Sequence, residues 1–306
     1  MNYRTHIFFR AAVLGAVVLS FAPALVAHAQ EPTVHPPAMV AVSPGKFEIE
    51  IGNRPTVQSV RLFNLGDREV EVQATVANWI LGDDSTVVVV EPTEQSLDQW
   101  IVINPLRFTI PARSSQTVRF AVRPRVEPDE GEHRAMLYFE EVLPAERNPG
   151  EVYVNFKVGV AVYGNAGEVR REPELHGVEV VSDNRVFAAR FDLSSHGNAH
   201  VRLGGQYVVW PAAAFPGPSA VLPIANVGEP DTELPAGVVA AGTLPNVPVL
   251  AGTRREIPLV VAHTLPAGEY VFATLGAISG QEFQEVVRFT VPVINATTVA
   301  GRQQEN

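Results

Sequence analysis

Apolar and polar residues alternate over short stretches along most of this chain, which is typical of half-buried β-strands. No segment sustains the 3.6-residue period of an amphipathic helix. The 25 prolines and 23 glycines fall mostly between the alternating runs, where turns are needed. The pattern therefore predicts an all-β protein, with its clearest strands at residues 47–51, 70–74, 118–122 and 286–291.

The pattern also repeats. Trp79 and Trp210 each follow a turn glycine by thirteen residues, and each stands at the end of a strand, turn and strand sequence. Gly131 and Gly268 then open a further strand in each half. The matching segments are 60–79 with 189–210, and 110–122 with 249–261. One supersecondary pattern occurring twice predicts two immunoglobulin-like β-sandwich domains in tandem, with about seven strands each.

The first 29 residues are typical of a secretory signal peptide. Arg4 and Arg10 precede an apolar run over 11–27, and a small-x-small site places the cleavage after Ala29. An uncleaved membrane anchor is the alternative, although the run has only 17 residues. We expect an exported protein, and no later stretch is long and apolar enough to span a bilayer.

The 277 residues that follow are long enough for two domains of ordinary size. We expect the first domain over 38–165 and the second over 170–295, followed by a disordered tail over 296–306. Between Trp210 and Val249 lie eight prolines and little periodicity. This segment, 211–248, is either a surface insertion or a functional and partly mobile flap.

The composition of the chain limits the chemistry that it can perform and the partners that it can bind. The chain has no cysteine, so neither disulfides nor thiol redox chemistry is available. Its formal charge of −10 disfavours nucleic acid and anionic membranes as partners, and favours a protein partner. Lys46 and Lys157 are the only lysines, against 21 arginines.

Few residues indicate catalysis or metal binding. His196 and His200 are four apart, but they flank an expected turn, and the sequence offers no third ligand close by. The acidic residues Glu127, Asp129, Glu130 and Glu132 do not follow the order of a calcium loop, and an acidic turn explains them equally well. Nucleophile-elbow, phosphate-loop and dinucleotide-binding motifs are missing. We therefore expect no cofactor, no metal and no enzymatic activity, and a sandwich hydrolase is the least favoured class.

The stretch 151–163 reads as one strand with an apolar face and a mixed face. Its apolar side chains are Val152, Val154, Phe156 and Val158, and the opposite side chains are Tyr153, Asn155, Lys157 and Gly159. Two interpretations stay open at this point. The face is ordinary core, as in most sandwich strands, or the strand is an edge whose apolar side chains await a partner.

Several motifs of the first half, in order over about 125 residues, resemble those of the PapD-like periplasmic chaperones of pilus assembly. They are VSPGK (42–46), LFNLGD (62–67), IPA (110–112) with TVR (117–119), PDEGEHRAMLY (128–138) and VLP (142–144). The second half shares only the sandwich pattern with that family.

The resemblance implies a function. A strand of the first domain would complete an incomplete pilus or surface subunit, which is the strand addition known between chaperone and pilin. Here Val152, Val154, Phe156 and Val158 would be the donated side chains. The implied partners are secreted subunits and an outer-membrane usher, and the implied location is the periplasm.

The resemblance also implies that two basic residues hold the subunit's terminal carboxylate. Lys46 stands at the first of these positions. Alignment by apolar residues puts Gly159 at the second, with Lys157 two residues earlier, or about 6.6 Å along the strand. The alternative is that the two lysines stand there by accident.

Two departures bear on the partners. The run 163–165 replaces the basic-proline ending common in the family, and the second domain is longer than the family's, so we expect a usher-type partner to be changed or absent. The competing hypothesis is an envelope protein, structural or adhesive, that binds a ligand through loops including 211–248.

Overall fold

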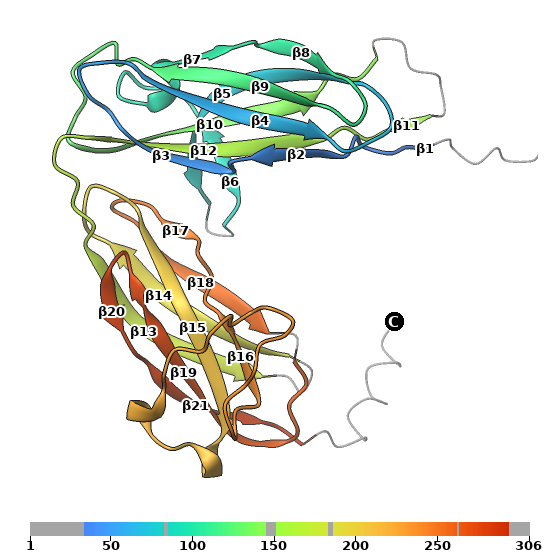
Figure 1. Ribbon diagram of the computed structural model, residues 1–306. Coiled ribbons are helices and arrows are strands. Elements are labelled where there is room, and N and C mark those ends of the chain that lie inside the picture. Colours follow the sequence, from blue (N-terminus) through green and yellow to red (C-terminus); the bar gives the residue numbers. More distant parts are fainter. Residues whose placement is uncertain (1–33, 83–84, 145–150, 183–185, 262, 294–306) are drawn as a thin grey trace, which may run out of the picture.

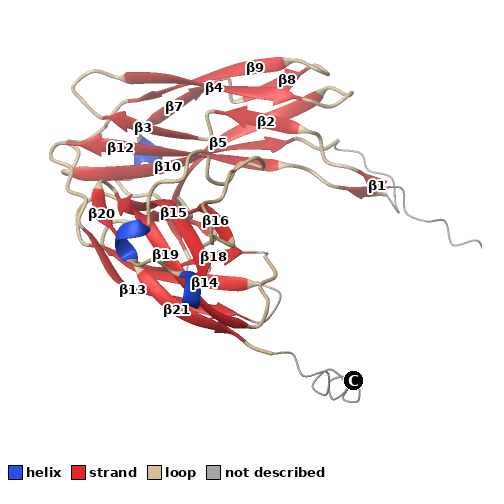
Figure 2. Cartoon of the chain, turned by 60° about the horizontal axis from the view of Figure 1, so that its bottom comes forward, coloured by secondary structure: helices blue, strands red, loops and turns tan. Residues whose placement is uncertain are grey.

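The computed structural model describes residues 34–82, 85–144, 151–182, 186–261 and 263–293. Within them the chain forms two β-sandwiches that meet at one end and diverge from there (Figure 1). Strands dominate the described chain (Figure 2), and its only helices are three 3₁₀ turns: η1 (Leu97–Gln99), η2 (Ala212–Ala214) and η3 (Pro218–Ala220). The all-β prediction with two immunoglobulin-like sandwiches is confirmed. The expected signal peptide, 1–29, and the tail, 296–306, lie outside the described residues.

The first sandwich has two facing sheets. One has the order β2-β4-β9-β7, with β2 (Val40–Ser43), β4 (Thr56–Asn64), β9 (Ser115–Val122) and β7 (Ile101–Asn104). The other has the order β3-β12-β10-β5-β6, with β3 (Lys46–Glu50), β12 (Lys157–Ala166), β10 (Gly131–Glu141), β5 (Val70–Leu81) and β6 (Val87–Val90). A short strand, β8 (Arg107–Ile110), also pairs with β5.

The first core follows from the alternation in the sequence. In β9, Val118, Phe120 and Val122 are buried while the residues between them are more exposed. The inward side chains of the facing sheet, such as Leu137 and Val160, pack against them in one cluster. Strand side chains alternate with period two, so one buried face per strand suffices to build this core.

The start of the chain contributes to both sheets of this sandwich. β2 pairs antiparallel with β4 in one sheet, and β3 pairs parallel with β12 in the other. A cis peptide bond between Ser43 and Pro44 lies at the crossing. The same short segment therefore borders the two sheets in turn.

The second sandwich repeats this plan. One sheet joins β13 (Pro173–Ser182), β14 (Phe187–Ser195) and β18 (Arg254–Val261). The other joins β16 (Ala240–Thr243), β15 (Val201–Pro211), β19 (Gly268–Ile278) and β20 (Gln281–Phe283), with β17 (Pro248–Val249) beside β15 and β21 (Val286–Val291) beside β19. Phe187, Phe191 and Phe272 lie at the centre of its core.

The structure confirms the internal repeat. β4 and β5 of the first sandwich correspond to β14 and β15 of the second, and each pair ends near its tryptophan. Gly131 and Gly268 are the first residues of β10 and β19, as predicted.

The proline-rich segment packs against the second sandwich. Phe215, Val221 and Ile224 lie with Trp210 and Val208 in a small apolar cluster outside the main core. The segment therefore forms an additional layer over the β15–β19 sheet. A cavity of about 340 Å³ remains beneath it, lined by mostly apolar side chains including Trp210, and by Glu233.

Candidate functional site

One half of β12 lacks a strand partner on one side. β10 pairs with β12 over its whole length, from Lys157 to Ala166. β3 lies on the other side and pairs only with residues 161–165. Within the described chain, residues 157–160 therefore form an open sheet edge.

The direction of the backbone groups can be worked out from two bonds. The carbonyl of Asn165 accepts a hydrogen bond from the Ile51 N–H at 2.7 Å, on the β3 side. Backbone groups alternate in direction along a strand, so Lys157 and Gly159 direct theirs to the same side. The carbonyl of Phe156 faces the other way, toward Glu141 N–H at 3.1 Å. The open edge thus offers the amide and carbonyl groups of Lys157 and Gly159 to an incoming strand.

The apolar row predicted along 151–163 is divided. The prediction of one continuous strand is wrong, because the chain forms β11 (Val152–Tyr153), then a break, then β12. Val152 and Val154 are exposed by 45% and 42%, whereas Phe156 packs partly against the first core and Val158 is half-buried. β10 ends at Glu141, one residue past the partner of Lys157, so it cannot extend the sheet to β11.

A short strand from the start of the described chain takes that place. β1 (Val34–His35) pairs parallel with β11, and Val154 N–H donates to the His35 carbonyl at 3.2 Å. The His35 and Tyr153 rings stack with centroids 4.3 Å apart. Glu151 accepts a hydrogen bond from Tyr153 Oη at 2.5 Å and lies 3.1 Å from His35 Nε2. One edge of β11 is therefore occupied by the chain itself.

The two lysines lie on the same face of the sheet but not together. Lys46 is paired with Ala161, four residues along β12 from Lys157, which is about 13 Å along the strand. Lys46 Nζ lies 3.0 Å from Glu48, and Lys157 Nζ lies 3.3 Å from Glu140. Both lysine side chains are 51% exposed. Such exposed pairs contribute at most about 1 kcal/mol, so another carboxylate can displace the present partner.

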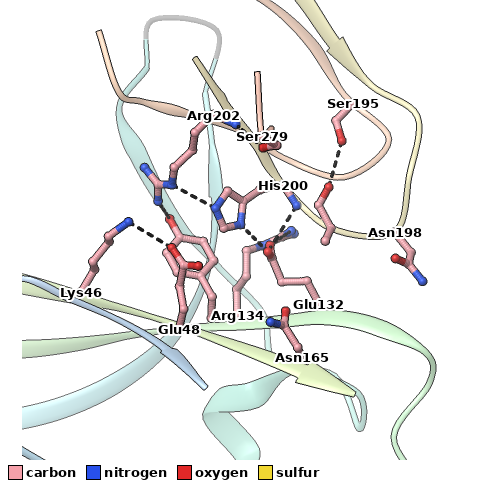
Figure 3. Close-up of polar contacts among 12 residues, drawn as sticks. Lys46, Glu48, Glu132, Arg134, Asn165, Ser195, Asn198, His200, Arg202 and Ser279 are labelled. Carbon is pink, nitrogen blue, oxygen red and sulfur yellow. Dashed lines mark hydrogen bonds and ion pairs between the residues drawn. The ribbon is translucent and has the colours of Figure 1, made fainter. Parts of the chain in front are cut away.

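Lys46 borders the cleft between the sandwiches, where polar residues from both sides meet (Figure 3). Glu132 of β10 and His200 of the second sandwich form a buried pair through Nδ1 of the imidazole. Glu132 also accepts bonds from His200 N–H and from Arg134 Nη1, both at 3.2 Å. These contacts join the two sandwiches at the start of β10.

Arg202 extends this network toward β12. Its Nε donates to His200 Nε2 at 2.9 Å, and its Nη2 donates to Tyr163 Oη at 3.1 Å. Because Nε2 accepts, the His200 proton belongs on Nδ1, facing Glu132, and the ring is the neutral tautomer. Lys46, Glu48 and Arg202 lie close together at the mouth of the cleft (Figure 3).

Burial and hydrogen bonding oppose each other at the two carboxylates of this site. Burial acts to raise the pKa of Glu132, but the bonds from His200 and the charge of Arg134 outweigh it, and the pKa lies below its ordinary value. At Glu48, burial again acts to raise the pKa, but the hydrogen bond and charge of the Lys46 ammonium outweigh it and hold the pKa below its ordinary value. Both groups are therefore ionised near neutral pH.

The linker between the sandwiches is held by the turn that precedes β15. Asn198 accepts the Arg170 N–H at 2.7 Å and donates to the Glu168 carbonyl at 2.8 Å. Glu132 N–H donates to the Asn198 carbonyl at 3.0 Å. Gly131 has φ +119°, and a Cβ there would lie 2.7 Å from that carbonyl. Only glycine allows this approach.

Two interpretations of the sequence change here. Glu132 does not belong simply to an acidic turn, because its side chain is buried between the domains. His200 and His196 point to different carboxylates, Glu132 and Glu174. Both strand starts are rich in polar residues, with His133 and Arg134 after Glu132 and Arg202 near His200, so the sequence carries no local signal of the buried pair.

No helix in the described ranges is long and apolar enough to cross a membrane. No protein-family model and no curated protein matches the sequence.

Solved structures do match over most of the chain. A chain of the CsuC–CsuE chaperone–tip adhesion subunit complex from archaic chaperone-usher Csu pili of Acinetobacter baumannii is 14% identical, with TM-score 0.40, covering 82% of this chain and 98% of that one. The class 5 fimbriae chaperone CfaA is 13% identical, with TM-score 0.38, covering 83% and 100%. The periplasmic chaperone SfaE is 12% identical, with TM-score 0.36, covering 83% and 100%.

Two of these solved structures are chaperones, CfaA of class 5 fimbriae and the periplasmic SfaE, and the third is a complex of a chaperone with a pilus subunit.

Proposed function

We propose that this protein is a periplasmic chaperone that binds incomplete immunoglobulin-like pilus or surface subunits by lending them a strand. The observation that carries the proposal is the open edge of β12 at residues 157–160, continued by the exposed Val152 and Val154. An exposed edge with apolar side chains is a feature that proteins suppress unless it is used.

Strand addition suits this edge physically. A subunit strand pairing with 157–160 would satisfy the free backbone groups of Lys157 and Gly159 and its own unpaired edge. Inserting Val152 and Val154 into a subunit groove would contribute about 0.6–1.4 kcal/mol for each, because the side chains are 45% and 42% exposed at the outset. Phe156 and Val158 would contribute less, since both are already partly buried in the first sandwich.

β1 holds one edge of β11, so β11 can donate that edge only if β1 leaves it. Its pairing with β11 spans only two residues, so the loss is small compared with a full subunit strand. Binding at that edge would exchange a short internal strand for a longer external one.

The two lysines keep separate roles in this proposal. Lys46, at the mouth of the cleft, would receive the terminal carboxylate of the subunit in exchange for Glu48. Lys157, about 13 Å away along the strand, would contact an acidic or carbonyl group further along the subunit. Release would follow by exchange with another strand, and no catalytic step is assigned.

The two domains of this chaperone would be 38–165 and 170–295. A signal peptide over 1–29 would direct export to the periplasm and be cleaved there. An outer-membrane usher would be a second partner, in addition to the subunit.

Photo-crosslinking tests the binding edge. A benzoylphenylalanine at Val152, in the bacterium that makes the protein, should cross-link to a secreted polypeptide whose own sequence forms an immunoglobulin-like sandwich short of one strand. The matched control is Val102, an exposed valine, 62% accessible, on the other sheet of the same sandwich. Equal cross-linking at Val102, or products that are complete folds, would contradict strand addition.

Charge reversal tests the carboxylate anchor. Lys46→Glu should abolish copurification of the subunit identified by cross-linking. Arg113→Glu is the control, because Arg113 also belongs to an exposed ion pair of the first sandwich, with Asp67, away from the cleft. Unchanged recovery with Lys46→Glu would remove Lys46 from the site.

A further inference from the structure

Three potential metal ligands converge at the start of the second sandwich. Glu174 and His176 lie on β13, and His196 follows β14. One ligand atom from each lies within 4.8 Å of the others. His196 Nε2 is 2.8 Å from Glu174 Oε2, and His176 Nδ1 is 3.6 Å from Glu174 Oε1. The carboxylate thus stands between two imidazoles.

A β-bulge creates this arrangement. The register of β13 against β14 shifts between Leu175 and Gly177, which leaves His176 as an extra residue. Bulges redirect side chains, and this one turns His176 toward Glu174. Glu174 is paired with Ser194, so His196, two residues further along, projects on the same side.

A buried hydroxyl orients the first imidazole. His176 Nε2 lies 2.8 Å from Ser194 Oγ, and Ser194 is buried. This bond leaves Nδ1 facing the carboxylate. Metal-binding histidines regularly use their second nitrogen for an outer hydrogen bond that fixes the ring orientation. The hydroxyl of Ser194 fits that role.

We propose that Glu174, His176 and His196 bind a divalent transition metal of the zinc class. Two imidazole nitrogens and a carboxylate are a regular donor set for Zn²⁺, and three protein ligands leave a position for water or a further ligand. Arg254 lies nearby, but Asp192 holds it through two bonds, at 2.8 Å and through Nη2 at 2.5 Å. The surroundings therefore do not add net positive charge.

The position gives the metal a structural consequence. His196 N–H donates to the Glu172 carbonyl at 2.9 Å, and Asn198 N–H donates to the Arg170 carbonyl at 3.0 Å. The metal would tie the first residues of β13 to the turn that holds the linker. Binding would therefore stiffen the junction of the two sandwiches. This inference does not rest on the chaperone role.

Titration calorimetry of the untagged mature chain with Zn²⁺, after chelator treatment, tests the site. One equivalent should bind. His176→Ala and His196→Ala should each abolish that event, and Ser194→Ala should weaken it by about 10- to 100-fold, as loss of an outer-sphere partner does. His263→Ala removes an exposed histidine elsewhere and should leave binding unchanged.

Binding that persists in both histidine variants, or that falls equally in His263→Ala, would overturn the proposal. His176 and His196 are exposed, so the two histidine variants should unfold at the same temperature as the metal-free parent. A Co²⁺ spectrum present in the parent and lost in His196→Ala would give a second readout that is independent of heat. Retention of that spectrum in His196→Ala would also count against the site.

Discussion

Trp79 and Trp210 stand at matching places in the repeat, yet different parts of the chain cover them. Trp79 packs with Tyr163 and Met136 of its own sheet and with Leu250 of the second sandwich. Trp210 packs with Val221 of the proline-rich segment. Both lie outside the main cores, on the outer face of a sheet. In one sandwich the neighbouring domain covers that face, and in the other an insertion does.

This difference accounts for the insertion in the second sandwich. A large aromatic on the outer face of a sheet needs a cover, and the apolar cluster around Trp210 contains no residue of the first sandwich. Residues 212–238 take that place. Trp79 therefore contacts the other domain, whereas Trp210, at the matching position, anchors the proline-rich segment.

Trp79→Ala should have the largest effect. It removes packing within the first sandwich and across the domain contact, so we expect a loss of about 4–5 kcal/mol in the free energy of unfolding, the upper part of the range for buried tryptophan. Urea unfolding measures the loss, and hydrogen exchange should rise at both Tyr163 and Leu250. Exchange that rises only in the first sandwich would show that Trp79 does not link the domains.

Trp210→Ala should cost somewhat less, about 3–4 kcal/mol, and the loss should be confined to the second sandwich. The segment 212–238 should become sensitive to a protease, while the cleft residues keep their protection. If a protease cleaved 212–238 at the same rate in Trp79→Ala, the segment would not depend specifically on Trp210.

Glu132→Gln should cost about 3 kcal/mol, the low end for breaking a buried ion pair, because it removes the ion pair with Arg134 while the amide can still accept one bond from His200. Double-mutant analysis with His200→Ala isolates the coupling between the domains. Additive losses would mean that the two side chains do not interact in solution.

Acid should weaken the same contact. The pKa of Glu132 in the folded protein lies below its ordinary value of 4.5, so its stabilisation is complete above about that pH and is lost as pH falls through the folded pKa. The difference in unfolding free energy between the parent and Glu132→Gln should therefore shrink below pH 4.5. A constant difference across the titration would argue against an ionised Glu132.

Val152→Ser and Val154→Ser should have the smallest effect on folding, within about 0.5 kcal/mol, since both side chains are exposed. Both should nevertheless reduce capture of the subunit. A large stability loss would show that these valines belong to the core of the first sandwich, as the simpler interpretation of the sequence has it.

Alternation and the spacing of turns were enough to predict the strands, the two sandwiches and the matching tryptophans. These features are local or repeat at a fixed distance, so a single sequence contains them. The position of Lys46 at the edge of the cleft could also be predicted, because Lys46 ends the VSPGK motif.

The remaining features depend on contacts between distant residues. β11 and β12 are separate strands because β10 ends at Glu141 and because β1 pairs with β11. In that pairing Val34 lies beside Val152, which is 118 residues later in the chain. Glu132 and His200 lie 68 residues apart. The ligands Glu174 and His176 meet His196 only because of a bulge, and a bulge leaves no mark in the alternation of this sequence.

The parallel pairing of β3 with β12 has a mechanical consequence. β3 continues from the amino end of the chain, and β12 continues into the second sandwich, so tension between the two ends would draw these strands in opposite directions. All of their hydrogen bonds would then be loaded together and not opened one by one. The protein should resist such a pull, while the unpaired half of β12 carries none of it.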